Sequence, residues 1–411
     1  MRPEVTGTEG SGRTEGSGRT EGSGRTEGSG RTEGSGRTEG SGRTEGSGRT
    51  EGSGRTEGSG RTEGSGRTEG SGVEPSAAAP ATRGGRARPG WLADLAMLPA
   101  LLALVAVLAV TTDGLLTPSN LINVLSQSAV VAIAAIGATF VILTGGIDLS
   151  TGSVIGAGGV AGAAVLVGTG SLAAGVAAGL ASGTLIGALI GLVVARLGVV
   201  PFAVTLAALY VVGGATTLLS HGRTIAPVPV GFIRFSIDGP AGVPYAVWLA
   251  VALYVVAQVA LTRTAWGRRV LHVGANAEVA RISGVDVARI RISVYAAAGL
   301  CSAIAGLVLT SGLAGAGAGM GGPLLLNIVG AVVLGGTRLT GGRGSLLRTG
   351  IGVLFLGFLA NGMSLFGLPS FDQQMVTGAF IFVAAAANGV GSWRGRIRHT
   401  DRSIPKDAID A

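Results

Sequence analysis

Apolar segments fill most of the chain between Trp91 and Gly391, and this pattern constrains the fold more than any other feature. A helix needs about 20 mainly apolar residues to cross the ~30 Å hydrocarbon core of a bilayer. The windows that approach this length are 92–110, 127–144, 152–168, 172–194, 202–219, 245–262, 292–311, 324–336, 349–366 and 375–391. Backbone polar groups in lipid must be satisfied within the protein, so these windows predict helices. We expect an all-α, polytopic membrane protein with about ten transmembrane helices, in which 324–336 is broken or re-entrant.

Positive residues fall on alternate loops between these windows. With a cytoplasmic N-terminus, the inside loops hold Arg196, the arginines of 263–291, Arg338, Arg343, Arg348 and the basic residues of the C-terminal tail. The outside loops hold only Arg223 and Arg234, both in the 220–244 connection. Cytoplasmic loops of membrane proteins carry an excess of Lys and Arg. The pattern therefore predicts an even number of spans, with both termini in the cytoplasm.

Small residues saturate several windows, as in Gly156–Gly162 and Gly175–Gly191. Glycine and alanine let helix backbones approach closely, where dispersion and weak hydrogen bonds replace the hydrophobic drive that lipid removes. We therefore expect a dense helical bundle.

The head of the chain has a different character. From Thr8 to Gly72 the unit Thr-Glu-Gly-Ser-Gly-Arg repeats without any apolar residue. No core can offset the conformational entropy of ordering such a segment. We expect residues 1–90 to be a disordered hydrophilic head with a basic flank at 73–90. The repeat from Thr8 to Gly72 should be dispensable for function, and the alternative is a partner-binding tail. Residues 91–391 then form the transmembrane domain, and 392–411 a cytoplasmic polar tail.

Composition argues against several functional classes. The net charge of +8 comes from residues that flank apolar windows, so it does not indicate nucleic-acid binding. The single lysine, Lys406, excludes a Walker A loop in this chain, and the single cysteine, Cys301, excludes an internal disulfide. The three histidines are far apart and cannot form a His-Glu-x-x-His zinc site. We expect a protein that is not an enzyme, with no catalytic, cofactor-binding or metal site of its own.

A polar, arginine-rich segment at 263–291 interrupts the apolar pattern. Within it, residues 273–285 have the spacing of a short amphipathic helix, with Asn276 as N-cap and Gly284 as stop. One interpretation is a docking element for a cytoplasmic partner. The alternative is a solvated loop helix with no partner.

Two further sets of polar residues are candidates for function. Asp148 lies at the edge of an apolar window, after Gly145 and Gly146 and before Ser150. It either helps to cap the following helix or lies in a transport path or gate. Asn327 and Asn361 lie within apolar windows, where an amide forms interhelical hydrogen bonds or contacts a substrate.

A secondary transporter is the main rival class. Such proteins carry ionisable residues near mid-membrane for ion coupling. Asp148 lies at a window edge and Asp94 near the start of the first window, and no acidic residue lies in the middle of a window. Proton or sodium coupling is therefore disfavoured.

With these residues laid out, the chain resembles the permease subunit of ATP-binding-cassette importers for simple sugars, the ribose/xylose/galactose group. The resemblance covers nearly all of 91–391 and rests on the order and spacing of several motifs. These are Ser119-Asn120-Leu121-Ile122-Asn123-Val124-Leu125, Gly145-Gly146-Ile147-Asp148-Leu149-Ser150, Gly274-x-Asn276-x-Glu278-x-Ala280-Arg281-x-Ser283-Gly284, Ala331-Val332-Val333-Leu334-Gly335-Gly336-Thr337 and Gly357-Phe358-Leu359-x-Asn361-Gly362.

The resemblance implies a ten-span permease in the plasma (inner) membrane of a prokaryote, paired with a second copy or a close paralogue. It implies two cytoplasmic ATPase subunits that carry ATP and Mg²⁺, and an extracytoplasmic sugar-binding protein that delivers a ribose-like monosaccharide. The segment that contacts the ATPase would comprise Asn276, Glu278, Ala280, Arg281, Ser283 and Gly284. Importers for branched-chain amino acids or autoinducer-like sugars are the nearest alternatives. The repeat head and the Gly/Ala-rich third and fourth spans depart from the family pattern.

Overall fold

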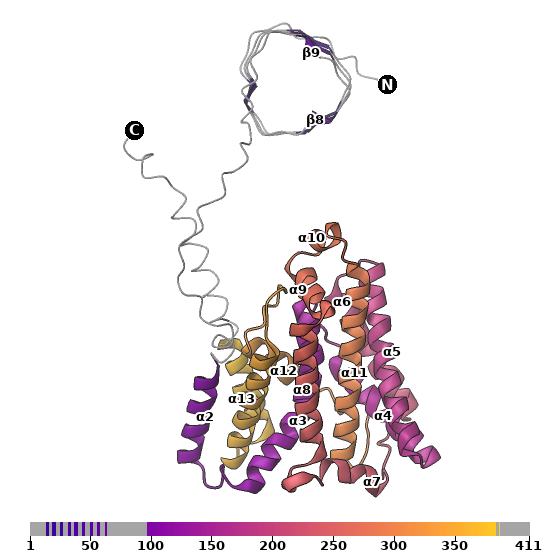
Figure 1. The fold of residues 1–411 in the computed structure, drawn as a ribbon, viewed down its shortest axis with the longest axis vertical. Coiled ribbons are helices and arrows are strands. Elements are labelled where there is room, and N and C mark those ends of the chain that lie inside the picture. Colours follow the sequence, from indigo (N-terminus) through magenta and orange to yellow (C-terminus); the bar gives the residue numbers. More distant parts are fainter. Residues whose placement is uncertain are drawn as a thin grey trace. The chain divides into compact units, whose positions relative to one another are not determined.

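The computed structural model describes residues 97–383 and residue 386, and the backbone of nine short strands in the N-terminal repeat (Figure 1). The chain forms two compact units, Met1–Gly85 and Arg86–Ala411. The basic flank at 73–90, the polar tail at 392–411 and parts of the first and last predicted windows lie outside the described residues.

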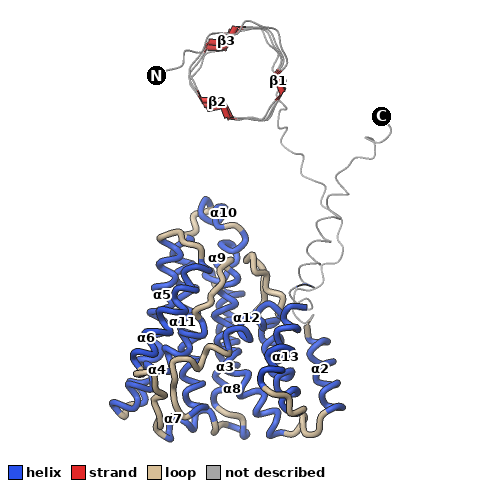
Figure 2. The backbone as a smooth tube through the Cα atoms, turned by 180° about the vertical axis from the view of Figure 1, so that it is seen from behind, coloured by secondary structure: helices blue, strands red, loops and turns tan. Residues whose placement is uncertain are grey.

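The nine strands of the first unit form three parallel three-stranded sheets, with orders β1-β4-β7, β2-β5-β8 and β3-β6-β9 (Figure 2). They are β1 Thr14–Glu15, β2 Arg19–Glu21, β3 Arg25–Glu27, β4 Thr32–Glu33, β5 Arg37–Glu39, β6 Arg43–Glu45, β7 Thr50–Glu51, β8 Thr56–Glu57 and β9 Thr62–Glu63. Thr14 pairs with Thr32, so the register advances by three copies of the hexapeptide. The strands contain only Arg, Thr and Glu. That the head is disordered and dispensable stays a prediction.

The second unit is helical where it is described. Its longer helices are α2 Leu98–Thr111, α3 Pro118–Leu143, α4 Thr151–Thr169, α5 Leu172–Arg196, α6 Pro201–Leu219, α8 Tyr245–Arg263, α11 Val287–Leu313, α12 Leu324–Leu334 and α13 Leu346–Leu365. Shorter elements are α7 Val230–Ile233, η1 Arg234–Ser236, η2 Pro240–Gly242, α9 Ala265–Ala275 and α10 Ala277–Ile282. Residues 370–383 are also helical.

Seven of these helices are long and apolar enough to cross a membrane, namely α3, α4, α5, α6, α8, α11 and α13. α2 and α12 are apolar but shorter. At 1.5 Å per residue, the 11 residues of α12 cover only about half of the hydrocarbon core, as expected of a broken or re-entrant segment. The helical class is thus confirmed for the described residues of the second unit, whereas the first unit contains the nine short strands, and the count of ten spans stays a prediction.

Two helices begin earlier than the apolar windows indicate. α3 begins at Pro118 rather than near 127, because proline suits the first turn of a helix and the polar residues that follow find hydrogen-bond partners. α11 begins at Val287 rather than at 292, because the Asp286 carboxylate caps it by accepting the Arg289 amide at 3.0 Å. An apolar window therefore indicates the part of a helix that lies in lipid, and it does not include the polar turns that extend beyond the lipid.

The core of the bundle is a seam between α4, α5 and α11. On α5 every fourth residue from Gly175 to Gly191 is a buried glycine, although most of the helix is not buried. A Cβ added at Gly187 would lie 2.3 Å from the Tyr295 carbonyl oxygen, and one at Gly299 would lie 2.1 Å from that of Gly183. The expected close packing of backbones through small residues is therefore confirmed at this seam.

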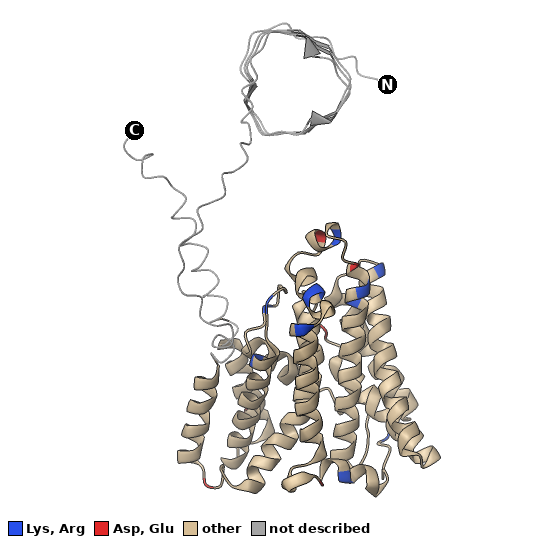
Figure 3. Cartoon of the chain, in the orientation of Figure 1, with Lys and Arg blue, Asp and Glu red and all other residues tan. Residues whose placement is uncertain are grey.

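Lys and Arg gather at the end of the bundle that carries α9 and α10 (Figure 3). The connection at the other end of α6 and α8 contains Arg223 and Arg234. This is the asymmetry that alternate basic loops predict.

Candidate functional site

The short helix predicted at 273–285 is present as α10, Ala277–Ile282, whereas residues 273–275 end the preceding helix α9. The Asn276 side-chain oxygen accepts the amides of Glu278 at 2.9 Å and Val279 at 3.1 Å, so Asn276 is the N-cap of α10. The predicted N-cap is confirmed.

The predicted stop at Gly284 is confirmed as well. Its φ of 81° lies in the left-handed region that favours glycine. The Gly284 amide donates to the Arg281 carbonyl and the Val285 amide to the Ala280 carbonyl, both at 3.0 Å. This pair of bonds is the Schellman motif, which satisfies the last carbonyls of a helix.

α10 anchors one small side chain and exposes the others. Ala280 is buried, whereas Val279 and Ile282 are 58% and 79% exposed. Arg281 Nη2 lies 2.6 Å from Glu278 Oε1, and this hydrogen-bonded pair lowers the pKa of the Glu278 carboxyl and raises that of Arg281. The helix thus offers two apolar side chains beside a charged pair, a composition suited to contact with another protein.

The base of this element meets two other loops at the same end of the bundle. We call Gly145, Gly274, Gly341 and Gly342 the glycine junction. The Gly342 amide donates to the Leu143 carbonyl at 2.9 Å. A Cβ at Gly274 would lie 1.7 Å from the Leu143 carbonyl oxygen, and a Cβ at Gly341 would lie 2.7 Å from the Gly145 nitrogen. The loop after α3, the end of α9 and the loop before α13 therefore touch backbone to backbone.

This junction was not predicted from the sequence, where Gly274 was placed only within the amphipathic helix at 273–285. The doubled glycines at 145–146 and 341–342 indicate that each loop closely approaches another segment of backbone. Spacing along the chain does not identify that segment.

Replacing Gly274 with alanine is expected to separate these segments, because the added methyl group would collide with backbone atoms that have no freedom to turn away. The expected cost is at least ~1–3 kcal/mol of stability, as for other overpacked sites. Thermal unfolding of the detergent-purified protein measures it. The matched control is Gly319→Ala, which has nothing within 4 Å of the added Cβ. Equal unfolding temperatures for the two variants would contradict the described junction.

Asp148 is buried in the turn that leads from α3 into α4. Its Oδ1 accepts the Ser150 amide at 2.8 Å and the Ser150 hydroxyl at 2.5 Å. Burial raises the pKa of the Asp148 carboxyl, and hydrogen bonds from Ser150 and Thr151 oppose this rise. Ser150 is the N-cap residue of α4, but its side chain makes no capping bond to the helix. This geometry favours a role for Asp148 in ordering the helix start; a role in a gate stays a prediction.

The two intramembrane asparagines differ in their surroundings. Asn361 on α13 and Asn120 on α3 exchange two amide hydrogen bonds, of 2.8 and 2.9 Å. Asn361 thus makes the predicted interhelical bond, and its partner Asn120 was not singled out from sequence. Asn327 on α12 is half-buried, and its amide has no hydrogen-bond partner among residues 97–383. Asn327 therefore remains a candidate for substrate contact.

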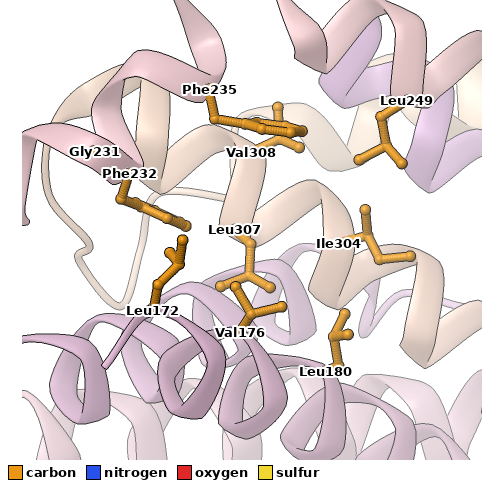
Figure 4. Close-up of a pocket in the computed structure, with 10 residues that line it drawn as sticks. All are labelled: Leu172, Val176, Leu180, Gly231, Phe232, Phe235, Leu249, Ile304, Leu307 and Val308. Atoms are coloured by element: carbon orange, nitrogen blue, oxygen red, sulfur yellow. The ribbon is translucent and has the colours of Figure 1, made fainter. Parts of the chain in front are cut away.

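The described residues also contain a pocket of about 430 Å³ (Figure 4), beside α7 at the end of the bundle opposite α10 (Figure 1). Only apolar side chains and Gly231 line it. Sites for polar small molecules place a few polar groups where they fix the ligand's orientation. The pocket therefore does not fit a sugar. No group of three or more His, Cys, Asp or Glu suited to a metal ion occurs within the part of the chain that the structure describes.

Comparison with known proteins places the chain in a family. Residues 120–385 match the profile of the permease component of the branched-chain amino acid transport system. The match covers more than half of the chain. The chain belongs to this family. It is a family of transport permeases and not of enzymes, and together with seven apolar helices it identifies an integral membrane protein.

Individual relatives of the permease carry the names of sugar transporters. This chain is 40% identical over 195 residues to the ribose import permease protein RbsC of Bacillus subtilis, and the aligned region covers 47% of this chain and 61% of the relative. It is 39% identical over 199 residues to RbsC of Escherichia coli (strain K12), with the same shares covered. It is 33% identical over 197 residues to the L-arabinose transport system permease protein AraH of Escherichia coli (strain K12), covering 47% and 58%. The permease thus matches about three fifths of these relatives' length, and the resemblance to sugar-importer permeases inferred from the motifs is confirmed.

Proposed function

We propose that this chain is the membrane-spanning subunit of an ATP-binding-cassette importer that translocates a ribose-like monosaccharide. The observation that carries the proposal is the 39–40% identity to two ribose import permeases. The similarity to an arabinose permease supports the wider class of pentose-like substrates.

The proposal includes a division of labour among several chains. This chain carries a single lysine and no Walker A loop, so ATP and Mg²⁺ would bind to two separate cytoplasmic ATPase subunits. An extracytoplasmic protein would deliver the sugar to a pair of permeases, either two copies or two paralogues. The basic end of the bundle would face the cytoplasm of a prokaryotic cell together with both termini.

α10 would receive the ATPase, and the glycine junction would pass its movement to the bundle. Closure of the ATPase pair would push on Val279 and Ile282. Because Gly274 and Gly342 both contact the backbone of Leu143, a displacement of α10 would move α3 and the loop before α13 together. The spans would then alternate between outward-open and inward-open arrangements. Each ligand can shift that equilibrium only by binding one state better than the other.

A permease for branched-chain amino acids is the second candidate, because the family description names that substrate. Ion-coupled transport is less well supported. Among the described residues Asp148 is the only buried carboxylate, and it lies at the end of a span.

The test is uptake by proteoliposomes that contain the permease and its ATPase subunits, with the binding protein outside. We expect labelled ribose to accumulate only when ATP is present on the ATPase side and the binding protein is supplied. Omitting either component is the matched control. Accumulation of leucine in place of ribose would select the second candidate, and ribose accumulation driven by an ion gradient without ATP would refute the importer class.

A further inference from the structure

The apolar pocket is built from three candidate membrane spans and a short lid (Figure 4). α5 contributes Leu172, Val176 and Leu180, and α8 and α11 provide the remaining helical walls. Phe232 of α7 and Phe235 of η1 close one end. No lining side chain carries a polar atom. An occupant must therefore be apolar along the length that lies in the pocket.

The lid is tied to the bundle by side-chain-to-backbone hydrogen bonds. The Ser311 hydroxyl on α11 donates to the Phe232 carbonyl at 2.7 Å, and the Ser236 hydroxyl donates to the Val308 carbonyl at 3.2 Å. Phe235 also stacks on Tyr245, with ring centroids 6.1 Å apart. These contacts fix the lid against α11 and the start of α8.

The residues around the lid place it at the membrane surface. Tyr245 and Trp248 occupy the start of α8 and are 48% and 49% exposed. Tyr and Trp gather at the headgroup level of membrane proteins. Arg234 lies between the two lid aromatics in sequence, and its side chain is 70% exposed. The pocket therefore begins at headgroup depth and extends into the hydrocarbon region.

Arg234 supplies an exposed positive charge on the lid, one residue before Phe235. Its ion pair with Asp238 is long, with 3.9 Å between Nε and Oδ2, and both side chains are more than half exposed. Exposed pairs of this kind contribute little. A guanidinium group binds phosphate oxygens through two parallel hydrogen bonds, which Asp238 would not prevent.

We propose that this pocket binds one acyl chain of an anionic phospholipid whose phosphate lies against Arg234. An acyl chain matches the wholly apolar lining, and a phosphate matches the exposed cation at the adjoining lid. The site is separate from α10 and from the glycine junction, and it does not depend on which substrate the permease carries.

The test counts phospholipids that remain bound to the detergent-purified full chain by native mass spectrometry. Phosphatidylglycerol and phosphatidylcholine are added as anionic and zwitterionic probes. Val176→Trp fills the pocket and is expected to weaken retention of phosphatidylglycerol about tenfold, equivalent to ~1.4 kcal/mol. The matched control is Leu185→Trp, on the same helix but outside the pocket and 63% exposed, which should retain the lipid.

Arg234→Gln tests the headgroup contact and should abolish the preference for phosphatidylglycerol over phosphatidylcholine. Arg223→Gln, also an exposed arginine of the 220–244 connection, should keep it. Leu172→Trp at the exposed rim of the pocket is a second filling variant if Val176→Trp lowers the unfolding temperature. Unchanged retention in a folded filling variant, or equal losses in Leu185→Trp, would overturn the proposal.

Discussion

Replacing Gly299 with alanine should destabilise the bundle sharply. The added Cβ would lie 2.1 Å from the Gly183 carbonyl oxygen and 3.0 Å from the Gly187 Cα. Both neighbours are backbone atoms of α5, so relief requires α5 and α11 to move apart along the whole seam. Overpacking of this kind costs ~1–3 kcal/mol or more, and Gly299→Leu should prevent recovery of folded protein. The measurement is the unfolding temperature in detergent, together with the yield of monodisperse protein.

Gly214→Ala on α6 is the matched control for this substitution. Its added Cβ would have nothing within 4 Å, and the residue is exposed in a helix. Alanine should therefore be neutral or stabilising by ~0.5–1 kcal/mol, because glycine loses more backbone entropy in a helix. Gly299→Ala should lower the unfolding temperature, whereas Gly214→Ala should leave it unchanged or raise it. A shift of the same sign and size in both would mean that the seam is not close-packed as described.

Replacing Ile282 with aspartate should uncouple the permease from its ATPase without unfolding it. Ile282 is 79% exposed on α10, so its loss removes no buried contact within the chain. An exposed anchor of an interface contributes ~2 kcal/mol or more, so association with the ATPase should weaken at least ~30-fold. Uptake and copurification of the ATPase measure this effect, and the unfolding temperature should stay unchanged. The same loss of uptake is expected for Glu278→Lys, which puts a second cation beside Arg281.

Ile237→Asp is the control at the opposite end of the bundle. Ile237 is also an exposed isoleucine, at 63%, and lies beside η1. Its substitution should leave copurification intact. Normal uptake by Ile282→Asp would refute docking through α10 and favour the alternative of a loop helix without a partner.

Local features of the chain were predictable in detail. Asn276 and Gly284 mark the ends of α10, because capping depends on residues within a few positions of each other. The apolar windows predicted where helices lie, with errors of up to nine residues at Pro118, where the helix continues beyond the apolar stretch.

Contacts between distant segments were not predictable in the same way. The amide of Asn361 was expected to bond across helices, but its partner Asn120 lies 241 residues away and was one of several polar residues in its segment. Likewise, the sequence left two roles open for Asp148. The two hydrogen bonds with Ser150 favour the structural one.

The amino-acid sequence by itself determined that this is a helical membrane protein and where its basic loops fall, and it predicted that nucleotide binds to separate subunits. Those properties follow from composition and from spacing within single segments. Only the tertiary structure decided that Gly145, Gly274 and Gly341 meet, and that Phe232 and Phe235 close a pocket over α5. These tertiary contacts depend on how helices from separate parts of the chain pack. Side-chain volume and close backbone approach at such contacts produce no periodic pattern in the sequence.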